Sequence, residues 1–225
     1  MSDQSQHIEY LQQALLEARK SPPKPTNFRV GCVIVSYEQL TAPRILASGY
    51  TLELPGNTHA EQCALLKLAA FHSSEESDLP KILTPSLNVT LYTTLEPCGK
   101  RLSGNLPCVQ RIIATRQQSP NAGVRKVIFG AKEPGTFVQD SQSCRLLTEA
   151  GIDWEYLPTL EEEILKVAME GHDKKPDSER SSNDVPPQKG QQQETEGTNV
   201  DAIGPEERKR QEEQPRNPKK RMMEI

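Results

Sequence analysis

The sequence has no apolar run that approaches the roughly 20 residues a membrane-spanning helix requires. Its first residues, MSDQSQHIEY, contain neither the basic stretch nor the apolar segment of a secretory signal. It also has no long basic stripe in its apolar-rich part, and its net charge is only −4, which argues against nucleic acid as the main partner. We therefore expect a soluble, cytoplasmic protein that neither enters a membrane nor acts chiefly on nucleic acid.

Aromatic residues are absent beyond residue 172, where Pro, Gln, Glu, Ser, Lys and Gly dominate. Such a segment cannot bury enough apolar surface to offset the entropy of ordering it. We predict one domain over residues 1–172 and a disordered polar tail over 173–225. The tail contains RKRQEEQPRNPKKR, which has two basic clusters. These clusters indicate a solvated charge run, an anion-binding arm or a nuclear import signal. A nuclear import signal would place the protein in the nucleus as well.

The cysteines are few, odd in number and unevenly spaced, which argues against a disulfide framework: Cys32, Cys63, Cys98, Cys108 and Cys144. Inside cells thiols stay reduced, so clustered Cys and His residues indicate metal binding or catalysis. Cys32 and Cys144 stand in apolar contexts, and we expect both to belong to the core.

Apolar periodicity and turn residues predict strands that alternate with helices. Strands are predicted over residues 29–35, 44–50, 87–98, 126–130 and 153–157, with the first two forming a hairpin. Helices are predicted over residues 6–20, from the motif NTHAEQCALL to about residue 72, from Pro107 onward, and over 143–151 and 160–172. This order indicates an α/β domain with a parallel or mixed sheet covered on both faces. Sites in such folds form where strand ends meet helix starts.

Three candidate zinc ligands lie at such junctions: His59, Cys98 and Cys108. A catalytic zinc takes three protein ligands and leaves the fourth position to water, whose pKa it lowers from about 15.7 to near 7. Glu61, two residues after His59, could then reach the water rather than the metal. The set matches the H-x-E and P-C motifs of zinc deaminases. The cysteines, however, are separated by nine residues instead of two.

The long loop CGKRLSGNLPC, together with NFRVGCVIV and PGNTHAEQCAL, resembles the deaminases of riboflavin biosynthesis. It looks most like their fungal branch, which acts on 2,5-diamino-6-ribitylamino-4(3H)-pyrimidinone 5′-phosphate. The resemblance implies a cytidine deaminase-like three-layer α/β/α fold with a mixed five-stranded sheet and a zinc-dependent hydrolytic deamination. It also implies a homo-oligomer, commonly a dimer.

The resemblance implies the same zinc ligands, with Glu61 as the proton shuttle. It places Asn27 in a segment that contacts the substrate. In the loop between the cysteines, Lys100, Arg101 and Ser103 are the best candidates to hold the substrate phosphate, since a phosphate favours cations and hydroxyl donors. The family often has a histidine after the first cysteine, where Gly99 and Lys100 stand here.

Three alternatives remain open at this point. Cys63 lies four residues after His59 and could share its helical face, which would give a closed Cys3His site with no catalysis. A nucleoside, nucleotide or tRNA-base deaminase would use the same chemistry, although those branches usually have the short cysteine spacing. A non-catalytic deaminase-like subunit acting through its tail would commonly lack the glutamate, and Glu61 is present.

Overall fold

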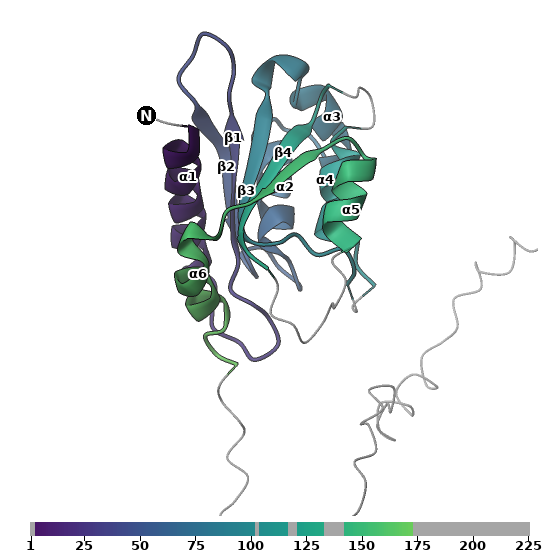
Figure 1. Cartoon of the computed structure of the whole chain (residues 1–225). Coiled ribbons are helices and arrows are strands. Elements are labelled where there is room, and N and C mark those ends of the chain that lie inside the picture. The colour runs from purple at the N-terminus through teal and green to yellow at the C-terminus, as the bar shows by residue number, and fades with distance from the viewer. Residues whose placement is uncertain (1–2, 102–103, 117–120, 133–141, 173–225) are drawn as a thin grey trace, which may run out of the picture. The chain divides into compact units, whose positions relative to one another are not determined.

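The computed structural model of the protein describes residues 3–101, 104–116, 121–132 and 142–172 (Figure 1). All of these belong to one compact unit, Met1–Asp177. Ser103 lies outside the described residues, as do residues 173–225 with their basic clusters. In the described part, no helix has both the length and the apolar character needed to cross a membrane.

A five-stranded mixed sheet forms the centre of the unit, as predicted. Its strands are β1 (Gly31–Ser36), β2 (Arg44–Tyr50), β3 (Val89–Leu95), β4 (Val124–Ala131) and β5 (Asp153–Tyr156), in the order β2-β1-β3-β4-β5. Strand β1 pairs antiparallel with both β2 and β3. Strands β3, β4 and β5 are parallel to one another. Since β2 and β3 both oppose β1, they run in the same direction and end at the same edge of the sheet.

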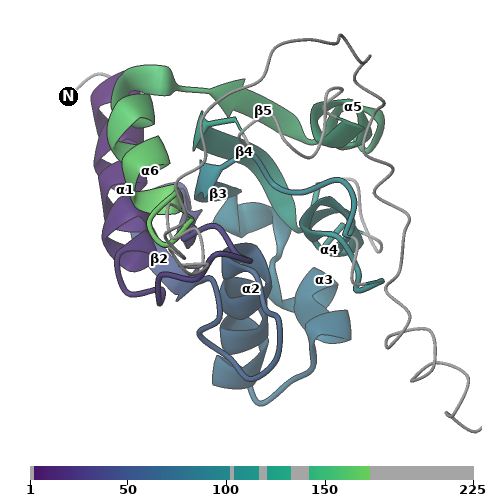
Figure 2. The ribbon, with the colours of Figure 1, turned by 90° about the horizontal axis from the view of Figure 1, so that it is seen from below.

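Helices cover both faces of this sheet, which confirms the three-layer arrangement (Figures 1 and 2). Helices α1 (Asp3–Ala18) and α6 (Glu161–Ala168) lie on one face. The other face carries α2 (Ala60–Phe71), α3 (Leu79–Ile82), α4 (Cys108–Ala114) and α5 (Gln142–Glu149). Three short 3-10 turns, Glu76–Asp78, Pro85–Leu87 and Pro158–Leu160, connect these elements.

The strands β1 and β3 are buried on both faces, although β3 includes three threonines. Every residue of β1 and β3 is buried. Successive side chains of a strand point to opposite faces, so Cys32 and Ile34 pack in the cluster under α2 while Val33 and Val35 pack under α1. The strand β1 therefore contributes to two cores at once.

Several predicted boundaries were wrong. The strand predicted over 87–98 ends at Leu95, because Pro97 has no N–H to donate to a neighbouring strand. The last helix was predicted over 160–172, but α6 ends at Ala168. The short elements between residues 72 and 88 were not predicted at all, since Pro80 and Pro85 interrupt their periodicity.

Candidate functional site

The predicted ligands come from three junctions at one edge of the sheet. His59 is the N-cap of α2, which follows β2; Cys98 lies in the turn after β3; and Cys108 is the first residue of α4. The Nδ1 atom of His59 lies 3.5 Å from Sγ of Cys98 and 3.4 Å from Sγ of Cys108. The potential ligand atoms of all three lie within 4.8 Å of one another. The parallel run of β2 and β3 therefore brings together residues that are far apart in the sequence.

These distances fit a tetrahedral zinc site. Zinc bonds of about 2.3 Å to sulfur and about 2.0 Å to nitrogen, at a tetrahedral angle, place nitrogen and sulfur about 3.5 Å apart. The two His59–Cys distances, 3.5 and 3.4 Å, agree with this value. Within the described residues, these three form the group of His, Cys, Asp and Glu side chains that could hold a metal ion. The set supplies three ligands, so a fourth position is left for water.

The site favours the thiolate form of Cys98. The backbone N–H of Cys108, in the first turn of α4, donates to Sγ of Cys98 at 3.4 Å. Hydrogen bonding from Cys108 and His59 lowers the pKa of the Cys98 thiol below its ordinary value. The thiolate is the form that binds metal, so this environment prepares Cys98 to act as a ligand.

Glu61 lies beside the ligand group and does not belong to it. Its side chain is almost wholly buried, with 3% of the residue exposed, and Thr93 Oγ1 of β3 donates to its Oε1 atom at 3.4 Å. Burial raises the pKa of the Glu61 carboxyl above its ordinary value, and the negative charge of Cys98 adds to the effect. A carboxyl group of raised pKa next to a metal site is well suited to accept and return a proton.

The structure does not support the closed Cys3His site. Cys63 is fully buried and is absent from the ligand group. Its Cβ atom instead faces β2, where it lies 2.9 Å from the point that a Cβ on Gly49 would occupy. The spacing of four residues was misleading because His59 is the N-cap and has an extended backbone, with φ −93° and ψ 160°, so it does not share the helical register.

The other two cysteines were both predicted to be core residues. Cys32 is fully buried, which confirms the prediction. Cys144 is only partly buried, and its Sγ donates to Oε1 of Glu96 at 3.3 Å. The prediction was wrong because Cys144 lies in the first turn of α5, which packs on the polar turn before Cys98. Ser143 also donates to Glu96, a residue to which the sequence assigned no role.

Two of the predicted substrate-binding residues, Asn27 and Arg101, contact the segment that leads to His59. Nδ2 of Asn27 donates to Oδ1 of Asn57 at 2.8 Å. Arg101 is buried and donates from Nη2 to the carbonyl oxygen of Asn57 at 2.5 Å. Lys100, by contrast, is exposed. Asn57 is therefore a shared partner that the sequence did not single out, although it stands in the motif around His59.

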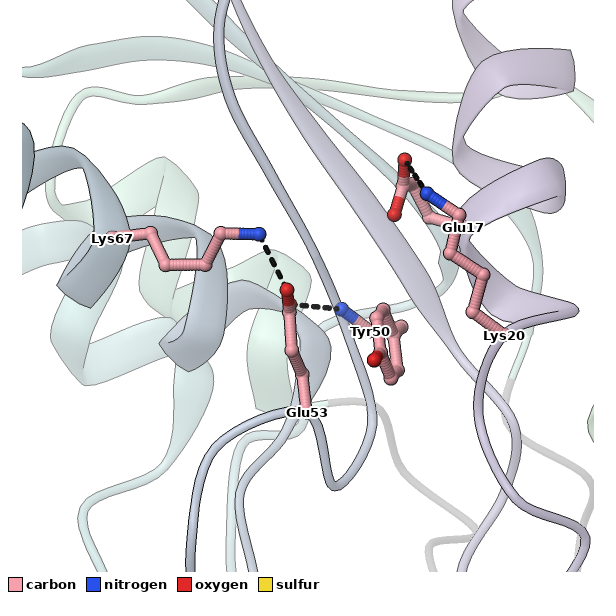
Figure 3. Close-up of polar contacts among 5 residues, drawn as sticks. All are labelled: Glu17, Lys20, Tyr50, Glu53 and Lys67. Atoms are coloured by element: carbon pink, nitrogen blue, oxygen red, sulfur yellow. Dashed lines mark hydrogen bonds and ion pairs between the residues drawn. The ribbon is translucent and has the colours of Figure 1, made fainter.

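Hydrogen bonds also hold the connection between β2 and α2 in place (Figure 3). The carboxylate of Glu53 accepts from the backbone N–H of Tyr50 at 3.2 Å and from Nζ of Lys67 at 2.5 Å. Further along, Thr58 donates from Oγ1 to the carbonyl of Leu54 at 2.9 Å. These contacts fix the connection to β2 and to α2, so the backbone that carries His59 is held in place. Figure 3 also shows the ion pair of Glu17 and Lys20, at 2.7 Å, at the end of α1.

Comparison with known proteins agrees with this geometry. The chain is 34% identical to a diaminohydroxyphosphoribosylamino-pyrimidine deaminase of Schizosaccharomyces pombe, over 74% of this chain and 36% of the relative, so it spans about a third of that protein's length. Crystal structures of the Aspergillus oryzae Rib2 deaminase, including one in complex with DARIPP, are 53% identical with a TM-score of 0.68, over 74% of this chain and 92% of theirs. The family model described as the cytidine and deoxycytidylate deaminase zinc-binding region matches residues 4–130. The chain therefore belongs to the cytidine and deoxycytidylate deaminase family.

Proposed function

We propose that the protein is a zinc-dependent hydrolase that deaminates 2,5-diamino-6-ribitylamino-4(3H)-pyrimidinone 5′-phosphate, a step of riboflavin biosynthesis. The observation that carries the proposal is the ligand group His59, Cys98 and Cys108 at zinc-compatible distances, with Glu61 buried beside it and outside it. The A. oryzae relative, 53% identical and crystallised with DARIPP, supports this substrate class.

The reaction exchanges an exocyclic amine for oxygen, and the proposed roles follow from the site. A bound zinc would lower the pKa of the attacking water to near 7. Glu61 takes a proton from that water as the oxygen attacks the ring carbon that bears the amine. The carboxyl then delivers this proton to the adjacent ring nitrogen. It next takes the remaining proton of the added hydroxyl and passes it to the amine, so that the carbon–nitrogen bond breaks, ammonia leaves and the ring carbon becomes a carbonyl. The proposed role of Glu61 as the carrier of the proton between these steps rests on its burial beside the ligand group.

Substrate recognition is proposed for the residues that surround the ligands. Lys100 is exposed in the loop between the cysteines and is free to approach a phosphate as a cation. For Asn27, which is half-buried next to Asn57, we propose a contact with the pyrimidine ring through its amide group. Ser103, the third polar candidate of the loop, stays a prediction of the sequence, as do the homo-oligomer and the cytoplasmic or nuclear location.

The experiment is an ammonia-release assay on purified protein whose zinc content has been measured. We expect release from the phosphorylated diaminopyrimidine, and little from cytidine, deoxycytidine monophosphate, guanine or tRNA. If zinc-loaded protein released no ammonia from the diaminopyrimidine, the proposed activity would be wrong. Faster release from a nucleotide or from tRNA would reassign the substrate and keep the chemistry.

A further inference from the structure

We propose that Arg101 is a positioning residue, which clamps residues 98–101 onto the segment that carries His59 and Glu61. The inference rests on the zinc site of the proposed function. It assigns Arg101 a role other than the phosphate contact expected from its charge alone.

The clamp consists of two hydrogen bonds from one guanidinium. Nη1 of Arg101 donates to Oε1 of Gln62 at 3.1 Å, and Nη2 donates to the carbonyl oxygen of Asn57 at 2.5 Å. Only 8% of Arg101 is exposed, so little of its surface is left for a substrate phosphate. The guanidinium lies against two neutral oxygen acceptors, both supplied by the protein itself.

The three partners stand next to the reacting groups in the sequence. Arg101 follows Cys98 by three residues, Asn57 precedes His59 by two, and Gln62 comes directly after Glu61. The Arg101 side chain therefore connects the segment after Cys98 to residues on both sides of the pair His59 and Glu61. Groups that hydrogen-bond directly to metal ligands typically change metal affinity or activity by about 10- to 100-fold when they are removed, and Arg101 acts on the backbone segments that carry the ligands.

The planar guanidinium suits this task better than an ammonium group. Its donors have a fixed fork geometry and can reach two acceptors at once, whereas lysine offers a compact charge on a flexible stem. We therefore expect Arg101→Lys to keep the charge and lose the clamp. A phosphate contact, in contrast, would be largely preserved by lysine.

The test is the rate at which folded, zinc-loaded protein releases its metal to a chromogenic chelator in the absence of substrate. We expect Arg101→Met to release zinc at least about tenfold faster than the wild type, and Arg101→Lys to be faster as well. Gln62→Leu should have a smaller effect because the bond to the Asn57 carbonyl remains. The double variant Arg101→Met/Gln62→Leu should be no faster than Arg101→Met alone, since both changes remove the same contact.

Arg29 provides a matched control. It is equally buried, with 7% exposed, and its guanidinium also bonds to main-chain oxygens, those of Arg19 and Ser21, and to Glu170. Arg29→Met should lower the thermal unfolding midpoint and leave zinc release below that midpoint unchanged. Equal acceleration in the Arg29 and Arg101 variants would show that general loosening is the cause and would overturn the proposal.

Two further outcomes would also overturn it. Unchanged zinc release in Arg101→Met, with a higher KM for the phosphorylated substrate, would assign Arg101 to phosphate binding. Independent, additive effects of the Arg101 and Gln62 changes would show that the two residues do not act together. Because the readout needs no substrate, a wild type that binds zinc and deaminates nothing would refute the proposed function alone, whereas a wild type without zinc would refute both.

Discussion

The Nδ1 atom of His59 lies 3.4 Å from Sγ of Cys108, although 49 positions separate the two residues in the sequence. The contact exists because β2 and β3 run in the same direction on either side of β1, so the chain leaves both strands at the same edge of the sheet. Helix α2 begins after the connection that follows one of these ends, and α4 begins after the loop that follows the other. The sheet topology therefore assembles the ligand group.

Replacing Glu61 with Gln tests the proton shuttle. The amide is nearly isosteric with the carboxylate, but it cannot accept and return a proton, and proton transfer of this kind contributes about 10²- to 10⁴-fold to rate. We expect kcat to fall by at least about 10²-fold, with zinc content unchanged by metal analysis. Glu75→Gln, on the exposed turn after α2, is the control and should keep the wild-type kcat. Loss of zinc from Glu61→Gln would mean that Glu61 is a ligand.

Cys108 and Cys63 are both buried, but replacing them should have opposite effects on zinc content and turnover. Cys108→Ala removes a ligand, so we expect it to lose zinc and turnover. Cys63→Ala removes a sulfur that packs against β2, so zinc content and kcat should stay at the wild-type level, while the free energy of unfolding falls by about 1 kcal/mol. Metal analysis, the ammonia assay and urea unfolding measure these three effects. If Cys63→Ala also lost its zinc, the site would be of the closed type.

Gly49 sets the distance between β2 and α2. A Cβ at this position would lie 2.5 Å from the backbone nitrogen of Ala64 and 2.6 Å from the carbonyl oxygen of Ala60. These are backbone atoms that cannot turn away, so we expect Gly49→Ala to lower the free energy of unfolding by about 1–3 kcal/mol. Ser48→Ala, at the neighbouring position of the same strand, should change it by less than about 0.5 kcal/mol. Equal urea midpoints for the two variants would show that α2 can move aside.

Much of the site could be predicted because its candidate ligands and Glu61 belong to short sequence motifs. Zinc requires particular ligand types, and the H-x-E and P-C patterns place them at a helix start or in the turn after a strand. The contact between Arg101 and Asn57 could not be predicted, since it joins two loops 44 positions apart and loop conformation has no periodicity. The polar setting of Cys144 was missed for a related reason, because the packing of α5 on the turn around Glu96 is a tertiary contact.

The sequence by itself determined the α/β alternation and the candidate ligands, with Glu61 beside them, because periodicity and ligand chemistry are local properties of the chain. The tertiary structure alone decided which cysteines act together. It separated Cys63 from the ligand group, since an N-cap residue with an extended backbone does not share a face with the fourth residue after it. It also gave Arg101 its hydrogen-bond partners, Gln62 Oε1 and the carbonyl oxygen of Asn57. A buried guanidinium needs such acceptors within the protein because it has lost its contact with water.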